Sequence, residues 1–221
     1  FRVLAFDLPG YGKSPPPPFE PTLANFAAVV RDFIEVRELR NVVLIGWSMG
    51  AGVVMSYCEQ FDDYRLAGIG IVDDCPRLLP GDGWDLGIDT TFDPAGLEDW
   101  RGRWAEDRRG VIRDLTEDEF VDSSHYSATV EWLIDESMDS DPATALASLL
   151  DAFDCDFRDG LSSIRVPTLL LYGGHSRFTT PANRLYMERS IPDARLVVFT
   201  ASAHNLMIEE AERFNLEVVG S

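Results

Sequence analysis

The chain has 221 residues and a mass of 24.7 kDa, and 45% of its residues are apolar and 26% charged, which is typical of one globular domain or of a domain with a sizeable insertion. Its 38 acidic and 19 basic side chains give a formal net charge of −19, which argues against nucleic acid and anionic membrane surfaces as partners. No apolar run approaches the roughly 20 residues that a membrane-spanning helix needs, so we expect a soluble protein with no membrane partner.

The cysteines Cys58, Cys75 and Cys155 are widely spaced and form no Cys-x-x-Cys or Cys/His pattern. This spacing predicts neither a disulfide framework nor a metal site. We therefore expect a reduced, cytoplasmic setting. The chain begins at Phe1 rather than Met, so the sequence leaves an upstream signal peptide open, and it says nothing about the oligomeric state.

Apolar runs and amphipathic stretches alternate along most of the chain. Short apolar runs without polar alternation predict strands at 1–6, 42–45, 66–72, 166–172 and 195–199. Between them, helices are predicted at 22–39, 49–60, 181–190 and 209–219. Strands and helices joined by short connections indicate an α/β fold, with a mostly parallel, doubly wound sheet that carries helices on both faces.

This alternation stops in the segment 76–161, where we predict an insertion with helices at 94–111, 128–138 and 142–153. By count, the segment has 22 acidic and 7 basic residues, so it carries −15 of the net −19. It also holds the four tryptophans Trp84, Trp100, Trp104 and Trp132. Two interpretations stay open: the rings form a small core of the insertion itself, or they line the underside of a lid over a ligand pocket.

The most informative motif is the pentapeptide Gly46-Trp47-Ser48-Met49-Gly50, which lies between a predicted strand and a predicted helix. A serine on such a tight turn adopts a strained backbone, and glycines two residues away on either side avoid collisions with the turn. Ser48 would project above the carboxyl edge of the sheet, where α/β proteins bind ligands. The Met49 amide, at the start of the helix, would then be available to an oxyanion. The plainer interpretation is a serine that only caps the helix.

Three segments resemble motifs of the α/β-hydrolase superfamily. Asp7–Ser14 is similar to its D-x-P-G-x-G-x-S loop, Gly46–Gly50 to its nucleophile elbow, and Ala203–Phe214 to its late G-H-x-x-x-x-E-x-P-x-x-F segment, with alanine in place of the usual Gly and Pro. The resemblance covers essentially the whole chain. It implies a hydrolase core formed by residues 1–75 and 162–221 and a helical cap, or lid, at 76–161.

The resemblance also implies a general base at His204, in the loop after the last strand, which would take the proton of Ser48. Relatives usually carry the orienting acid just after the strand that corresponds to 166–172. In this chain, Ser176 occupies that place. Zearalenone lactonases and some other relatives take the acid from the end of the preceding core strand, where this chain has Asp73 followed by Asp74. We predict Asp73 as the acid and Asp74 as the alternative; a solvated pair without a catalytic role is the plainer interpretation.

These residues predict a cofactor-free serine hydrolase that cleaves an ester, lactone or related carbonyl substrate through an acyl-enzyme, most simply a carboxylic ester hydrolase. Met49 would donate to the oxyanion. Carbon–carbon bond hydrolases and perhydrolases share the same arrangement, and the sequence does not separate them. We expect substrate contacts from Trp47, Trp84 and Trp104. The aromatic residues of the insertion favour an uncharged or hydrophobic small molecule as substrate, and the negative charge of the insertion disfavours a dianion.

A second hypothesis is a catalytically weak relative that binds a small molecule beneath its cap. Relatives carry a His-Gly loop, which supplies the second oxyanion donor, before the strand that Phe1–Phe6 resembles, and no such loop occurs in this sequence. We therefore expect this chain to be a fragment of a longer gene product. The absence of that loop, together with Ser176, motivates the second hypothesis.

Overall fold

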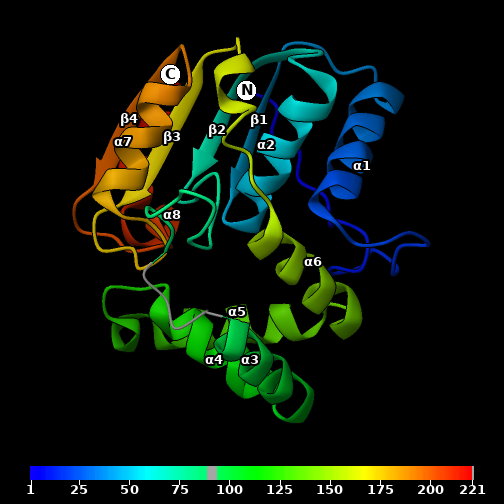
Figure 1. The fold of residues 1–221 in the computed structure, drawn as a ribbon, viewed down its shortest axis with the longest axis vertical. Coiled ribbons are helices and arrows are strands. Elements are labelled where there is room, and N and C mark those ends of the chain that lie inside the picture. The colour runs from blue at the N-terminus through cyan, green and yellow to red at the C-terminus, as the bar shows by residue number, and fades with distance from the viewer. Residues whose placement is uncertain (89–93, 221) are drawn as a thin grey trace.

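Four parallel strands form the sheet of this protein in a computed structural model, which describes residues 1–88 and 94–220. They lie side by side in the order β1 (Val42–Trp47), β2 (Leu66–Val72), β3 (Thr168–Gly173) and β4 (Ala194–Phe199) (Figure 1). The inner strands β2 and β3 are apolar and largely buried, as expected of strands that are covered on both faces. The predicted α/β fold class is confirmed.

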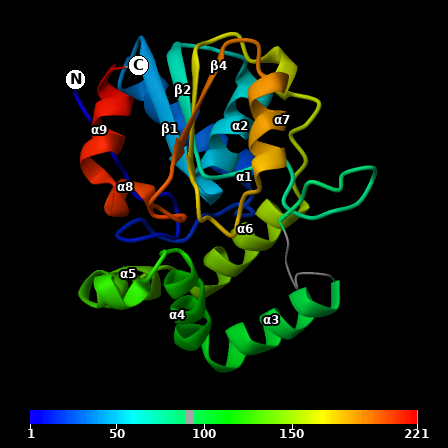
Figure 2. The same ribbon diagram turned by 90° about the vertical axis from the view of Figure 1, so that its left-hand side faces the viewer.

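Helices cover both faces of the sheet (Figure 2). One face carries α1 (Leu23–Val36), α2 (Met49–Phe61) and α7 (Pro181–Ser190), and the other carries the short α8 (Leu206–Glu209) and α9 (Ala211–Gly220). The first layer buries the larger hydrophobic core, in which Phe26, Tyr57 and Tyr172 have no exposed surface. None of the helices in the described ranges is long and apolar enough to cross a membrane.

The segment 76–161, called the helical insertion below, lies at the carboxyl end of the strands (Figures 1 and 2). It contains α3 (Pro94–Glu106), α4 (Arg108–Asp118), α5 (Ser127–Met138) and α6 (Pro142–Asp154). Trp100, Trp104 and Ile134 belong to a hydrophobic cluster formed within these helices. The insertion therefore has a small core of its own, while its status as a separate cap domain stays a prediction.

The strand predicted at residues 1–6 is wrong, because the structure gives these residues no regular secondary structure. Phe1 is 96% exposed, and Phe6 stacks on the ring of Phe33 in α1 with 4.4 Å between the ring centroids. An apolar run becomes a strand only where a neighbouring strand supplies hydrogen-bond partners. The edge strand β1 does not pair with this segment.

Two of the predicted helices are each divided in the structure. The helix expected at 94–111 breaks at Asp107, whose side chain accepts a hydrogen bond from the Gly110 amide at 2.9 Å and so caps α4. The helix expected at 209–219 breaks at Glu210, whose carboxylate accepts hydrogen bonds from the Ala201 amide and the Ser202 hydroxyl. The side chain chemistry of a single residue overrides the apolar periodicity in both places.

Candidate active site

Ser48 lies on the sharp turn that joins β1 to α2, and its φ of 53° is in the left-handed region that non-glycine residues rarely adopt. Its amide donates to the carbonyl oxygen of Val72 at 3.0 Å, which holds the turn against the end of β2. A Cβ at Gly46 would lie 2.1 Å from the carbonyl oxygen of Gly50, so only glycine fits there. A Cβ at Gly50 would meet nothing within 4 Å, so the collision expected at Gly50 is absent; its carbonyl makes the close approach instead.

The first residue of α2 is Met49. The amides of the first turn of a helix have no acceptor within the helix, and the helix dipole adds a partial positive charge at this end. Both Ser48 and Met49 line one cavity at the carboxyl edge of the sheet. The Met49 amide is therefore suited to bind an oxyanion that develops beside the Ser48 hydroxyl.

Asp73 directly follows β2, just as Ser48 directly follows the neighbouring strand β1. Its amide donates to the carbonyl oxygen of Leu171 at 2.8 Å, and its φ of 50° turns the chain sharply after β2. Its carboxylate Oδ2 lies 2.6 Å from Nδ1 of His204, and both residues are 1% exposed. Within the described ranges, Asp74 makes no hydrogen bond to His204. The structure thus brings His204 together with the first of the two candidate acids.

The Asp73 carboxylate accepts three further hydrogen bonds. Oδ2 accepts from the Ser176 hydroxyl at 2.5 Å, and Oδ1 accepts from the Thr179 hydroxyl at 3.0 Å and from the Gly173 amide at 3.2 Å. With His204, each oxygen therefore has two donors. Ser176, the residue at the place where the resemblance had led us to expect an acid, is thus a hydrogen-bond donor to the Asp73 carboxylate.

The Thr179 hydroxyl is oriented by a buried arginine. Arg184 in α7 donates from Nε to Thr179 Oγ1 at 3.1 Å and from Nη2 to the Thr179 carbonyl oxygen at 3.0 Å. Because Oγ1 accepts from the guanidinium, its single proton is left for Asp73. Burial lowers the pKa of Arg184, whereas the charge of Asp73 raises it. No sequence motif had indicated Thr179 or Arg184, because they meet Asp73 only through the fold.

Several contacts hold the His204 ring. The ring of Phe178 packs 4.4 Å from it and that of Trp47 4.9 Å from it, and Trp47 Nε1 donates to the His204 carbonyl oxygen at 2.9 Å. Burial by itself lowers the pKa of His204, but the hydrogen bond to Asp73 and its charge, aided by Glu119, raise this pKa above the ordinary value. A histidine in this state is a stronger base than a free imidazole.

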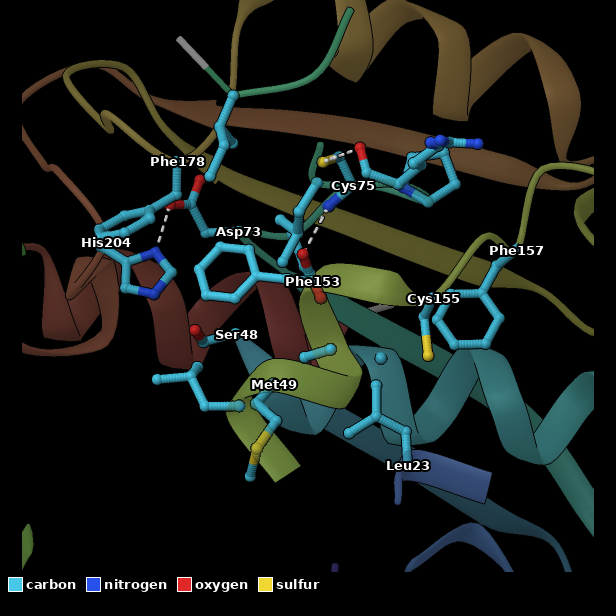
Figure 3. Close-up of a pocket in the computed structure, with 18 of the residues that line it drawn as sticks. Leu23, Ser48, Met49, Asp73, Cys75, Phe153, Cys155, Phe157, Phe178 and His204 are labelled. Atoms are coloured by element: carbon cyan, nitrogen blue, oxygen red, sulfur yellow. Dashed lines mark hydrogen bonds and ion pairs between the residues drawn. The ribbon is translucent and has the colours of Figure 1, made fainter. Parts of the chain in front are cut away.

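The cavity contains Ser48, Asp73 and His204 together (Figure 3). Ser48 and His204 face the same space in Figure 3, although no hydrogen bond joins them among the described residues. Such contacts are often long without substrate and tighten when it binds. The rest of the lining is mostly apolar and comes from the core as well as from the helical insertion; it includes Leu23, Leu115, Leu149, Phe153, Phe157 and Phe178.

The tryptophan that lines the cavity is Trp100. In the described structure, the tryptophans that we expected to contact the substrate, Trp47, Trp84 and Trp104, do not line the cavity. Trp47 packs behind His204, Trp84 packs on Tyr186 and donates to the carbonyl oxygen of Arg77, and Trp104 lies in the cluster within the insertion. The sequence left open whether the tryptophans of the insertion form a core or line a pocket, and it could not show which ring reaches the cavity.

The helical insertion is tied to the loop that carries His204. The Asn205 amide donates to the Glu119 carbonyl oxygen at 3.1 Å, and Asn205 Nδ2 donates to Glu119 Oε2 at 2.9 Å. Glu209 accepts from the amides of Val121 and Ala203 at 2.9 and 2.7 Å. Glu119 also lines the cavity, and burial raises its pKa. No pattern in the sequence indicated these contacts, which lie between distant segments.

The described residues contain no group of three or more His, Cys, Asp or Glu side chains that could hold a metal ion, and the three cysteines are free thiols. Burial raises the pKa of Cys58 and of Cys155 to about 12. These two thiols therefore stay protonated near neutral pH and are poor nucleophiles.

A family model described as the alpha/beta hydrolase family matches residues 1–217. The chain is 25% identical over 216 residues to the AB hydrolase superfamily protein YisY of Bacillus subtilis (strain 168), which covers 97% of this chain and 79% of that protein. It is 30% identical over 230 residues to a non-heme chloroperoxidase of Streptomyces lividans, with 99% and 80% covered. An esterase structure from Exiguobacterium antarcticum superposes with a TM-score of 0.89 at 26% identity, with 97% and 78% covered. The chain belongs to the alpha/beta hydrolase family.

Proposed function

We propose that this protein is a serine hydrolase that cleaves an ester, lactone or related carbonyl substrate through an acyl-enzyme. The observation that carries the proposal is the 2.6 Å contact between Asp73 Oδ2 and His204 Nδ1, in the cavity into which Ser48 projects from a strained turn. A nucleophile, a base and a group that orients the base are the parts that acyl transfer requires. The similarity to an esterase structure agrees with this class of reaction.

Each residue has a definite step in the proposed mechanism. His204 Nε2 takes the proton of Ser48 as Oγ attacks the carbonyl carbon, and Asp73 holds the imidazolium that forms. The Met49 amide binds the oxyanion of the tetrahedral intermediate. His204 then protonates the leaving alcohol, which leaves the acyl group on Ser48. In the second half of the reaction His204 deprotonates a water molecule that attacks the acyl group, and it returns the proton to Ser48 as the carboxylic acid product leaves.

The lining of the cavity supports an uncharged, hydrophobic substrate. Most of its side chains are apolar, and the carboxyl groups of Asp74 and Glu119 are also part of the lining. Arg77, the arginine in the lining, is paired with Asp82 and Asp156 at 2.8 and 2.9 Å. A carboxylate on the substrate would therefore find no free cation among the described lining residues.

Labelling with a fluorophosphonate probe tests the proposal, because such probes react with activated serines. We expect a single adduct, which peptide mass spectrometry locates at Ser48, and hydrolysis of phenyl acetate that Ser48→Ala abolishes. Asp73→Asn should slow both reactions far more than Asp74→Asn does. A wild-type chain that is neither labelled nor active, but binds small apolar molecules equally well after Ser48→Ala, would instead support the ligand-binding hypothesis.

The 30% identity to a protein named a non-heme chloroperoxidase favours perhydrolysis as a second activity of the same site. Hydrogen peroxide would take the place of water, attack the acyl-enzyme and leave as a peracid, while Ser48 recovers its proton through His204. Peracid formation from acetate esters and peroxide, measured beside hydrolysis and lost in Ser48→Ala, distinguishes this activity from simple ester cleavage.

A further inference from the structure

The Asp74 carboxyl lines the cavity but takes no part in the mechanism proposed above. It is 7% exposed, and its Oδ1 accepts a hydrogen bond from the Cys75 amide at 2.8 Å. No ion pair joins it to a basic side chain anywhere in the described part of the chain. Burial of a carboxyl group without a basic partner is unfavourable for folding, so a functional role would explain why the chain has one here.

Asp74 borders an apolar recess of the cavity whose lining includes Leu23, Cys155 and Phe157. Figure 3 shows Leu23, Cys155 and Phe157 on one side of the cavity and His204 and Phe178 on the other. Burial raises the pKa of Asp74 to about 7, although the amides of Cys75 and Gly52 and the charge of His204 lower it. Near neutral pH this carboxyl is thus present in both its protonated and its ionised form.

A glycine keeps space open beside Asp74. A Cβ on Gly52 in α2 would lie 2.7 Å from Leu23 Cδ1 and 3.8 Å from both Asp74 Oδ2 and Phe157 Cε2. Any larger residue at this position would press on Leu23 and fill the space in front of the carboxyl. The recess therefore combines apolar walls with the hydrogen-bonding carboxyl of Asp74, a combination typical of sites that fix the orientation of a ligand.

We propose that Asp74 selects substrates that carry a hydroxyl group away from the scissile carbonyl, and that it binds this hydroxyl by a hydrogen bond in the recess. The inference rests on the proposed function and names its substrate class. A hydroxyl both donates and accepts, so it pairs with either form of the carboxyl. A substrate carboxylate would be repelled by ionised Asp74 and Glu119, and an ammonium group pairs only with the ionised form.

Ester pairs that exchange a hydroxyl for a methyl group of similar size test the proposal. Methyl 3-hydroxybutanoate and methyl 3-methylbutanoate probe the acyl side, and 2-hydroxyethyl butanoate and propyl butanoate probe the alcohol side. We expect the wild type to prefer the hydroxylated member of at least one pair by about 10- to 100-fold in kcat/KM, the range that a hydrogen bond to a charged group supplies. Asp74→Leu should abolish that preference, and Asp74→Asn, which keeps hydrogen-bonding groups, should retain part of it.

The ratio within each pair is its own control, because a general loss of activity or folding cancels from it. Calorimetric binding of the same four esters to Ser48→Ala and to Ser48→Ala/Asp74→Leu gives a second readout that needs no turnover. The proposal is overturned if Asp74→Leu changes neither the kcat/KM ratio of either ester pair nor the ratio of their binding affinities. Failure of the wild type to hydrolyse any ester would count against the proposed function alone, and the binding ratios would then decide the role of Asp74.

Discussion

Two adjacent carboxyl groups at the end of β2 have contrasting surroundings. Asp73 accepts hydrogen bonds from His204, Ser176, Thr179 and the Gly173 amide, a set of donors that leaves the carboxylate one orientation. Asp74 accepts from the Cys75 amide and faces apolar side chains. The same residue type, one position apart, is thereby suited to two different tasks.

The raised pKa of His204 predicts the pH dependence of the proposed reaction. Only the neutral imidazole can act as a base, so kcat/KM for a neutral ester should rise with pH through an apparent pKa above the ordinary value of about 6.5. Asp73→Asn removes the charge that raises this pKa. We expect the variant to lose about 10⁴-fold in kcat and its midpoint to move to lower pH.

Titration of the imidazole by NMR, in the wild type and in Asp73→Asn, measures the same shift without turnover. Asp74→Asn is the matched control, because Asp73 is hydrogen-bonded to His204 whereas Asp74 makes no hydrogen bond to it in the described structure. A wild-type midpoint at or below 6.5, or the same midpoint in Asp73→Asn, would contradict the assigned pairing.

At the scale of an element, the turn between β1 and α2 determines where the nucleophile lies. The Ser48 amide is bound to Val72, and Gly46 lies so close to the Gly50 carbonyl that no side chain fits between them. The strand, the turn and the first turn of the helix therefore form one unit. Its strained backbone is held by the packing on both sides, as is common at functional sites.

Gly46→Ala and Gly50→Ala test this account of the turn as a matched pair. The new Cβ of Gly46→Ala would lie 2.1 Å from a backbone oxygen, so we expect a loss of ~3 kcal/mol in unfolding free energy and the loss of fluorophosphonate labelling. Gly50→Ala adds a Cβ in open space at the start of a helix, so it should not lower stability. Urea denaturation measures both, and equal destabilisation by the two changes would refute the steric argument.

At the scale of the whole molecule, negative charge is concentrated on the helical insertion, at the carboxyl end of the sheet where the cavity lies. The insertion carries −15 of the net −19, by the count of its acidic and basic residues. Its exposed ion pairs, such as Arg109 with Asp135 and Arg113 with Glu131, contribute little stability individually. The excess of acidic residues has a larger effect, because it sets the electrostatic field that an approaching ligand meets.

This field predicts a salt effect that depends on the charge of the substrate. Raising the ionic strength from 10 mM to 1 M shortens the Debye length from about 30 Å to about 3 Å. We expect kcat/KM for the anionic ester phenyl succinate to rise several-fold relative to that for neutral phenyl acetate. Steady-state kinetics on the two esters at matched pH measure the ratio, and a ratio independent of salt would show that the insertion exerts no such field at the cavity.

Local patterns in the sequence predicted most of the fold. The apolar runs at 42–45 and 66–72 predicted β1 and β2, and the glycines around Ser48 predicted the turn between β1 and α2. The same patterns failed at residues 1–6, which lack a partner strand, and at Asp107 and Glu210, where side chain hydrogen bonds divide a periodic stretch into two helices. Periodicity reports which face is apolar, but it does not report which neighbours are present.

The sequence by itself determined the fold class and the candidate residues, because strand and helix periodicity and the elbow motif depend on residues only a few positions apart. The tertiary structure alone decided that His204 meets Asp73 rather than Asp74, that Thr179 and Arg184 stand behind this carboxylate, and that Trp100 reaches the cavity. Asp73 and His204 are 131 positions apart in the chain. Contacts at such separations depend on the pairing and twist of the strands and the packing of the helices, which no local pattern encodes.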